Sequence, residues 1–451
     1  MPHRASLPSA EERLLRGREP WLWTNPKRRR MADCADGLPL GLADVSDAEA
    51  RLDRFAPLLA ELFGELRGAG GRIESDLLPA PRLARRLRER GGLALAGELL
   101  LKADHALPVA GSVKARGGIY GVLHFAEKVA LDEGVLTGTD DDYRKLALPP
   151  ARSRFGRHEL TVASTGNLGL SIGVTGAALG FGVTVHMSVE AKDWKKRRLR
   201  DLGVRVVEHA SDYTAACAAA RAEARRTPRI HYIDDENSVE LFLGYSVAAL
   251  RLRDQLSRTG PAVDGEHPLF LYLPCGVGGA PGGITLGARC VFGDPVHCFF
   301  AEPVEAPCML LGMLTGRHAD VSVYEVGLHL KTEADGLAVS RPSRLVGQLM
   351  EPLLGGCYTV TDERLFGFVA DLYETEGIEV EPSAAAGCAG PEMLLTTPAG
   401  RAYLDAHGLA EHMASARHVV WTTGGLFVPP EQHEAFRRRA AGRTPQAGAE
   451  T

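Results

Sequence analysis

Residues 160–187 read LTVASTGNLGLSIGVTGAALGFGVTVHM, and their pattern indicates a parallel α/β architecture. Two short apolar runs flank a longer segment of helical character, which closes at Gly180. The expected elements, continued to residue 208, are a strand at 160–163, a helix at 168–179, a strand at 183–187, a helix at 193–202 and a strand at 204–208. This β-α-β-α-β order is typical of a parallel sheet with helices on its faces.

The same alternation continues on both sides of this stretch. Further expected elements are strands at 269–273, 296–301 and 418–421, and N-terminal helices at 47–66 and 82–90. Residues 132–153 are polar and contain proline, so we expect an irregular surface insertion there. The tail after Phe436 is rich in arginine, alanine and glycine, and we expect it to fray.

Composition narrows the classes of function. The chain has 451 residues, of which 45% are hydrophobic and 24% charged, and this suits a globular protein of two domains. The net charge of −5 disfavours nucleic acid as a partner, and no apolar run is long enough to suggest a membrane span. The eight cysteines form no C-x-x-C pair, and the N-terminus lacks an apolar signal region. We therefore expect reduced thiols in a cytoplasmic protein.

One lysine stands out as a candidate nucleophile. Only nine of the 52 lysine and arginine residues are lysines, and Lys114 follows Gly111 and Ser112 at the expected start of a helix. The positive partial charge of a helix start favours a neutral amine, and a neutral amine condenses with aldehydes. The spacing alone also fits a solvated lysine at a turn.

Three turns that follow expected strands have residues suited to ligands. The Ser-Thr-Gly-Asn turn at 164–167 offers hydroxyl, amide and N–H groups to an anion such as a carboxylate, although the same residues are common helix caps. Five glycines between 276 and 283 leave backbone N–H groups open to a phosphate, with a tight turn as the alternative. Thr423 follows the strand at 418–421, where side chains face a ligand crevice or form a structural turn.

Taken together, these segments resemble the bacterial D-serine dehydratase (D-serine ammonia-lyase) family. The similar motifs are Gly-Ser-Val-Lys-Ala-Arg-Gly-Gly at 111–118, Ser-Thr-Gly-Asn-Leu-Gly-Leu-Ser at 164–171, Leu-Pro-Cys-Gly-Val-Gly-Gly-Ala-Pro-Gly-Gly at 273–283, and further stretches at 232–238, 297–308 and 334–339. The similarity extends roughly over 21–430. That family uses pyridoxal phosphate and belongs to fold-type II, the fold of the tryptophan synthase β-subunit.

The resemblance implies a fold and a division of the chain. The fold implied is α/β, with two open, twisted, mostly parallel sheets and flanking helices. A large cofactor-binding domain would comprise 1–120 and 235–440, and a smaller α/β domain at 121–234 would carry the Ser-Thr-Gly-Asn turn. Residues 441–451 would form a frayed tail.

The resemblance also implies a role for each site residue. Lys114 would hold pyridoxal phosphate as an internal aldimine and is a candidate base for the Cα proton. The remaining roles are Asn167 on the ring hydroxyl oxygen, Thr423 at the ring nitrogen, Gly276, Val277, Gly278 and Gly279 on the phosphate, Ser164 and Thr165 on the substrate carboxylate, Asp234 on the substrate hydroxyl, and Glu302 as ligand of K⁺ or another monovalent cation.

Two residues depart from the family pattern. Ala280 stands where the phosphate loop usually has another glycine, which a negative φ would tolerate. Leu426 replaces the third glycine after Thr423 and would narrow the pocket or shift the loop that holds Thr423. Both changes bear on affinity or substrate range rather than on the reaction.

The implied activity is β-elimination of D-serine to pyruvate and ammonia, with D-threonine giving 2-oxobutanoate as a side reaction. Spacing cannot separate this activity from that of an L-serine/threonine dehydratase or a serine racemase of the same fold. A non-catalytic module that binds pyridoxal phosphate is the alternative from another class. The expected partner is a small D-amino acid, without nucleic acid or membrane, and the expected assembly is a monomer, with a dimer as the alternative.

Overall fold

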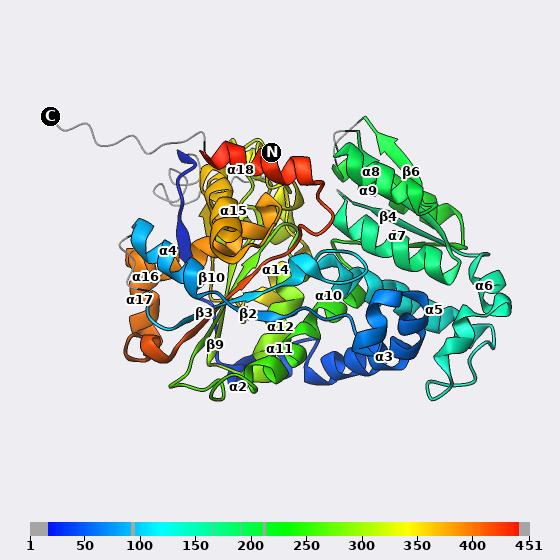
Figure 1. The fold of residues 1–451 in the computed structure, drawn as a ribbon, viewed down its shortest axis with the longest axis horizontal. Helices are drawn as coiled ribbons and strands as arrows, with labels where there is room; N and C mark the ends of the chain where they lie inside the picture. The colour runs from blue at the N-terminus through cyan, green and yellow to red at the C-terminus, as the bar shows by residue number, and fades with distance from the viewer. Residues whose placement is uncertain (1–16, 92–94, 165, 190, 211–212, 442–451) are drawn as a thin grey trace.

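Two separate β-sheets organise the chain into a larger and a smaller α/β unit (Figure 1). The computed structural model describes residues 17–91, 95–164, 166–189, 191–210 and 213–441. The larger sheet has the strand order β1 (Leu22–Thr24), β10 (Gly356–Val360), β9 (Val296–Pro303), β8 (Leu269–Pro274), β11 (Arg417–Trp421), β3 (Glu98–Lys102) and β2 (Leu77–Pro79). The smaller sheet has the order β6 (Arg205–His209), β5 (Gly182–Ser188), β4 (Glu159–Ala163) and β7 (Ile230–Tyr232). Only the two edge pairs, β1 with β10 and β2 with β3, are antiparallel among these described strands.

Helices cover both sheets. Those in and beside the smaller unit are α5 (Tyr120–Asp132), α6 (Pro149–Phe155), α7 (Asn167–Leu179), α8 (Asp193–Asp201) and α9 (Tyr213–Arg226). Those of the larger unit are α2 (Met31–Cys34), α3 (Leu42–Leu62), α4 (Pro81–Gly91), α10 (Val239–Ser246), α11 (Ala248–Leu256), α12 (Gly279–Phe292), α13 (Cys308–Thr315), α14 (Arg344–Met350), α15 (Asp362–Glu376), α16 (Gly390–Thr396), α17 (Pro398–Ala406) and α18 (Pro430–Ala441). Short 3₁₀ or π turns are η1 (Ala35–Gly37), η2 (Gly64–Ala69), η3 (Asp104–Ala106), η4 (Ala115–Ile119), η5 (Tyr143–Ala147), η6 (His318–Asp320), η7 (Val323–Val326), η8 (Asp335–Leu337), η9 (Pro382–Ala389) and η10 (Ala410–Ser415).

The α/β order expected from the sequence is confirmed. β4, α7, β5, α8 and β6 follow one another as predicted, and the strands expected at 269–273, 296–301 and 418–421 are the adjacent β8, β9 and β11. Two expectations were wrong. The insertion at 132–153 contains the short helical segments η5 and α6, and α18 continues past Phe436 to Ala441. Residues 442–451 lie outside the described part of the chain.

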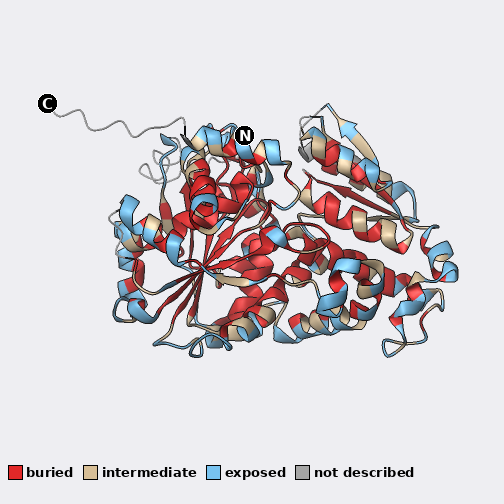
Figure 2. Ribbon diagram, viewed as in Figure 1, coloured by how far each residue is buried: buried red, intermediate tan, exposed pale blue. Residues whose placement is uncertain are grey.

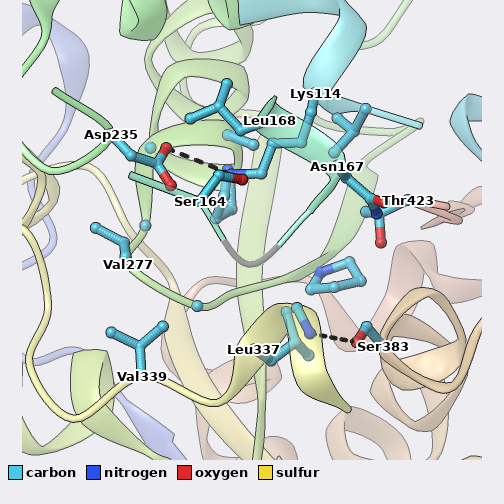
Figure 3. A pocket seen from close by; sticks show the side chains of 18 of the residues that line it. Lys114, Ser164, Asn167, Leu168, Asp235, Val277, Leu337, Val339, Ser383 and Thr423 are labelled. Atoms are coloured by element: carbon cyan, nitrogen blue, oxygen red, sulfur yellow. Dashed lines mark hydrogen bonds and ion pairs between the residues drawn. The ribbon is translucent and has the colours of Figure 1, made fainter. Parts of the chain in front are cut away.

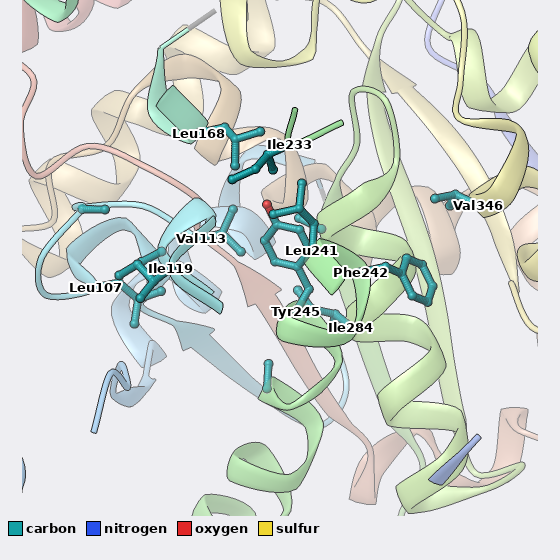
Figure 4. Close-up of a cluster of buried hydrophobic side chains, with 14 of the residues drawn as sticks. Leu107, Val113, Ile119, Leu168, Ile233, Leu241, Phe242, Tyr245, Ile284 and Val346 are labelled. Atoms are coloured by element: carbon teal, nitrogen blue, oxygen red, sulfur yellow. The ribbon is translucent and has the colours of Figure 1, made fainter. Parts of the chain in front are cut away.

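The core explains why β8 is a continuous apolar run. All six of its residues are buried, since helices pack on both faces of the larger sheet (Figure 2). Leu269, Leu271 and Leu273 point into one hydrophobic cluster, whereas Phe270 and Tyr272 point into the other, as the two-residue period of a strand requires. The first cluster continues into the smaller unit, and Figure 4 shows part of it around Tyr245.

The strand ends position the site. β8 pairs with β9 and β11 in parallel, with Leu271 opposite Cys298 and Val419, so their carboxyl ends lie at one edge of the sheet. All four strands of the smaller sheet fall within 121–234 and all seven of the larger sheet outside it. The proposed domain limits themselves stay a prediction. No helix in the described ranges combines the length and the apolar composition that a membrane crossing needs.

Candidate active site

A pocket lies between the two units, at the carboxyl ends of β4, β8 and β11 (Figure 3). The empty space in and above it measures about 780 Å³, which includes a part open to solvent. Eight segments of the chain contribute to its lining. Six of them lie in the motifs and stretches described above, whereas the segments at Lys195 and at 381–383 do not. The lining residues used below are Lys114, Ser164, Asn167, Lys195, Asp235, Gly276, Val277, Gly278, Gly279, Ala280, Glu381, Ser383 and Thr423.

Lys114 points into this pocket. Its Nζ lies 3.5 Å from Asp235 Oδ1 and 5.8 Å from the centre of the Tyr245 ring. Burial acts to lower the pKa of Lys114, but Asp235 and Tyr245 outweigh it and raise that pKa above its usual value. The expectation that a helix start favours the neutral amine was therefore wrong, because a neighbouring carboxylate stabilises the ammonium form.

The backbone around Lys114 is tied to the strand end that carries Thr423. Val113 N donates to Thr423 O at 2.8 Å, and Ser112 and Gly424 form an antiparallel bridge. Gly111 has φ +63, and a side chain there would meet the Phe427 ring at 2.8 Å. This close approach requires glycine and places Lys114 and Thr423 in one wall of the pocket.

A network of charged side chains lies beside the Lys114 segment and is centred on Arg116, two residues further along the chain. Arg116 donates to both oxygens of Asp104, at 2.6 and 2.8 Å, and pairs with Glu74 at 2.6 Å. Lys102 Nζ lies 2.7 Å from the same Glu74 oxygen, and Trp421 Nε1 donates to Asp104 Oδ2 at 2.7 Å. The network thus joins the Lys114 segment to β3 and to β11. Each buried charge has an opposite charge beside it, as burial demands.

The Ser-Thr-Gly-Asn turn joins β4 to α7. Ser164 Oγ accepts from the N–H groups of Gly166 and Gly169, each at 3.0 Å, so its oxygen caps the start of α7. Asn167 Nδ2 donates to Glu381 Oε1 at 2.8 Å. Ser164 and Asn167 both line the pocket, whereas Thr165 lies outside the described residues.

The glycine-rich loop leads from β8 into the 14-residue helix α12. Gly278 has φ +110, and a side chain there would lie 2.4 Å from Met309 Cε. The first N–H groups of α12 have no acceptor within their own helix, and they begin at Gly279 beside the pocket. This arrangement suits a phosphate. Ala280 is helical and has no positive φ, so alanine is tolerated there, as expected.

The loop after Thr423 does not place Leu426 in the pocket, where we expected it to narrow the space. Gly424 abuts the pocket, because a side chain there would lie 2.4 Å from Glu381 Oε1. Leu426 is 51% exposed and is not part of the pocket lining. Leu426 therefore does not narrow this pocket. Its neighbour Phe427 packs under the guanidinium of Arg198, with 3.5 Å between the guanidinium carbon and the ring centre.

Of the two adjacent aspartates after β7, the second faces the site. Asp235 lines the pocket, whereas Asp234 does not. Asp234 Oδ2 instead pairs with Arg221 at 3.0 Å, and Oδ1 accepts from Glu236 N. This placement does not favour the substrate role expected of Asp234. Sequence spacing could not choose between neighbours, because the choice depends on how the chain turns after β7.

Glu302 lies on β9, fully buried and outside the pocket lining. Its Oε1 accepts from Met309 N at 2.7 Å and its Oε2 from Leu310 N at 2.9 Å. Burial raises the pKa of Glu302 to about 8, although the two N–H groups act to lower it. Within the described ranges no group of three or more His, Cys, Asp and Glu side chains is arranged to hold a metal ion. The cation role of Glu302 stays a prediction.

Three further pocket residues were not predicted: Lys195, Glu381 and Ser383. Glu381 accepts from Asn167, Lys195 lies beside Glu381, and Ser383 Oγ accepts from Gly336 N at 3.1 Å. No motif marks these residues in the sequence. Lys195 lies in a short run of lysines and arginines, a pattern typical of a solvent-exposed helix face. Its burial follows only from the packing of α8 against the larger unit.

A family model and several known proteins match most of this chain. Residues 71–400 match the family model described as pyridoxal-phosphate dependent enzyme. A probable D-serine dehydratase from Acidovorax ebreus (strain TPSY) is 55% identical over 430 residues, covering 94% of this chain and 95% of that protein. Another from Geobacillus stearothermophilus is 53% identical, covering 92% of this chain and 90% of that protein.

Two solved structures share the fold at low identity. Diaminopropionate ammonia lyase from Escherichia coli in complex with D-serine superposes with a TM-score of 0.70 at 16% identity, covering 94% of this chain and 97% of that chain. Threonine deaminase isoform 2 from Solanum lycopersicum superposes with a TM-score of 0.60 at 17% identity, covering 94% and 93%. At these identities the likeness shows the fold alone.

Proposed function

This chain belongs to the D-serine dehydratase family of pyridoxal-phosphate dependent enzymes, and from that premise we propose that it converts D-serine to pyruvate and ammonia. The observation that carries the proposal is the meeting of Lys114 with the glycine loop and the Ser-Thr-Gly-Asn turn in one pocket of a chain 55% identical to such relatives. D-threonine is the proposed side substrate.

The pocket residues suit a phosphorylated aldehyde. Lys114 would attach covalently to the aldehyde carbon, and the N–H groups of residues 276–279, which lead into α12, would bind the phosphate. The Asn167 amide would meet the ring oxygen, and the Thr423 hydroxyl the ring nitrogen. When bound, the cofactor draws electrons away from the substrate Cα, which makes the Cα proton acidic.

Lys114 and Asp235 would handle the protons. Lys114 must lose its extra proton before it can act as a nucleophile or base, and Asp235 is the nearest carboxylate among the described residues, at 3.5 Å. Asp235 is also the pocket carboxylate that we assign to the substrate hydroxyl, in place of Asp234. A protonated Asp235 would donate to the hydroxyl as it leaves. Ser164 and the N–H groups of its turn would hold the substrate carboxylate.

The Thr423 hydroxyl has a consequence for the course of the reaction. A hydroxyl would not require a protonated ring nitrogen, whereas a carboxylate at that position would. The bound cofactor would then withdraw less electron density from Cα, which would favour loss of the β-hydroxyl over reprotonation at Cα. The chain would therefore act as a dehydratase more readily than as a racemase.

We also propose that K⁺ or a similar monovalent cation binds at Glu302. A carboxylate whose pKa burial raises to about 8 is costly to keep ionised, and an adjacent cation would offset that cost. A monomer in the cytoplasm is the proposed assembly and location. The eight cysteines all lie in the described part of the chain and form no disulfide there, and seven of them are buried, which suits a reducing compartment.

The test is pyruvate release by the purified protein with added pyridoxal phosphate, from D-serine and L-serine separately, with and without K⁺. We expect pyruvate from D-serine alone, faster with K⁺. Lys114→Ala should lower turnover by about 10³-fold or more and abolish the visible absorbance of the bound cofactor. Pyruvate mainly from L-serine would keep the fold but overturn the proposed substrate. A holoenzyme spectrum unchanged in Lys114→Ala would overturn the role of that lysine.

A further inference from the structure

Lys195 is a buried cation to which the proposed reaction gives no role. It lies on α8 of the smaller unit, its side chain is 2% exposed, and it lines the pocket. Its Nζ lies 3.2 Å from Asp335 Oδ2 and 4.0 Å from Glu381 Oε2. Both carboxylates belong to the larger unit, so this one ammonium group joins the two units across the pocket.

The stem of Lys195 crosses the Ser-Thr-Gly-Asn turn. A side chain at Gly166 would lie 2.3 Å from Lys195 Cδ, and Gly166 has φ +150. Glycine at 166 therefore makes room for the lysine. At the end of the same turn Asn167 donates to Glu381 Oε1 at 2.8 Å. Glu381 is thus shared between Lys195 and Asn167.

Two neighbours in the chain extend the contact. Lys192 is the N-cap residue of α8, three residues before Lys195, and Arg198 follows Lys195 by three residues on the same face of the helix. Lys192 Nζ is 4.0 Å from Asp335 Oδ2, and Arg198 stacks on Phe427. This face of α8 is set against the larger unit. Burial acts to lower the pKa of Lys195, but Asp335 and Glu381 raise it, so the group stays charged.

Resting on the proposed function, we propose that Lys195 is a positioning residue that holds α8 against the larger unit and, through Glu381, fixes the Asn167 amide in the pocket. Without the ammonium, the buried Glu381 would lose its ion pair, and the half-buried Asp335 would keep only the more distant Lys192. The Glu381 carboxylate would turn or take up a proton, and Asn167 would lose its fixed acceptor. The consequence would fall on substrate binding and on the surroundings of the cofactor ring.

The test compares wild-type holoenzyme with Lys195→Met and Lys195→Arg. In Lys195→Met we expect KM for D-serine to rise about tenfold or more, with kcat changed by about threefold or less. The absorbance maximum of the bound cofactor should shift, because Asn167 is proposed to contact its ring. Hydrogen exchange of peptides spanning 164–170 and 381–389 should increase in the apoprotein. Lys195→Arg keeps the charge and should restore part of each effect.

Lys196→Met is the matched control. Lys196 is the next residue on α8 and equally buried, but its Nζ pairs with Glu208 at 2.8 Å and with Val189 O at 2.6 Å, both within the smaller unit. Equal effects of the two substitutions, or no effect of Lys195→Met, would overturn the proposal. Should the wild type release no pyruvate, the proposed function fails, while absorbance and hydrogen exchange still decide the role of Lys195.

Discussion

Lys114 and Asp235 set the protonation of the site at the scale of single residues. The sequence argument for a neutral Lys114 considered only the dipole of its own helix, which is a weak effect. A carboxylate 3.5 Å away has the opposite and larger influence, and it comes from a segment 121 positions further along the chain. The place of Lys114 in the pocket was therefore predictable from its motif, whereas its ionisation was not.

Asp235→Asn tests which of the two adjacent aspartates serves the site. We expect kcat for D-serine to fall about tenfold or more, because asparagine can neither take a proton from Lys114 nor donate one to the leaving hydroxyl. The raised pKa of Lys114 should fall as well, which would move the pH profile of cofactor attachment to lower pH. Asp234→Asn breaks a surface pair with Arg221 and should change kcat by about twofold or less. A larger loss of kcat in Asp234→Asn than in Asp235→Asn would return the substrate role to Asp234.

At the scale of elements, the sequence predicted best where a single segment carries its own signal. The continuous apolar run of β8, the glycines that follow it and the start of α12 occupy one local stretch, so their order was foreseeable. The edge strands β1 and β2 have only three residues each, and their pairing depends on distant partners. The helices of the 132–153 insertion were missed for a similar reason, since each is too short to show a clear period.

Gly278→Ala tests the shape of the phosphate loop. Its φ of +110 and the approach of Met309 Cε to 2.4 Å leave no room for a methyl group. We expect the affinity for pyridoxal phosphate, measured by titrating the apoprotein, to fall about tenfold or more, and the free energy of unfolding to fall by about 1–3 kcal/mol.

Gly293→Ala is the matched control at the other end of α12. Gly293 also has a positive φ, +70, but the atom nearest to an added methyl group is 4.0 Å away and belongs to Pro295. This variant should lose about 1 kcal/mol of stability from backbone strain alone, with cofactor affinity unchanged. Equal cofactor affinity in Gly278→Ala and Gly293→Ala would contradict the phosphate role of the loop.

At the scale of the whole molecule, the site depends on contacts that the sequence separates widely. Lys195 meets Asp335 across 140 positions, and Asn167 meets Glu381 across 214. Each motif could be found on its own, but which charges pair between motifs follows only from how the two units pack. For this reason the presence of Lys114, Asn167 and the glycine loop in the pocket was predictable, whereas that of Lys195, Glu381 and Asp235 was not.

The buried network under Lys114 has the same long-range character, and it makes stability depend on pH. Burial acts to raise the pKa of Glu74, but Arg116 and Lys102 outweigh it and lower that pKa from 4.5 to about 2. A carboxylate with a lowered pKa stabilises the folded chain above its unfolded pKa, and this contribution is lost as the pH falls from 4.5 through 2. At neutral pH the contribution amounts to about 3 kcal/mol.

Glu74→Gln should therefore unfold at a lower urea concentration than the wild type at pH 7, by the equivalent of about 3 kcal/mol, and the difference should shrink to about 1 kcal/mol at pH 3. Urea midpoints at fixed ionic strength give both values. Glu376→Gln is the control, because Glu376 lies outside this network and pairs with the exposed Arg82 at 3.2 Å. A difference in the free energy of unfolding between Glu74→Gln and the wild type that stays constant from pH 7 to pH 3 would show that Glu74 acts through packing. Its charge would then be unimportant for holding the Lys114 segment to β3 and β11.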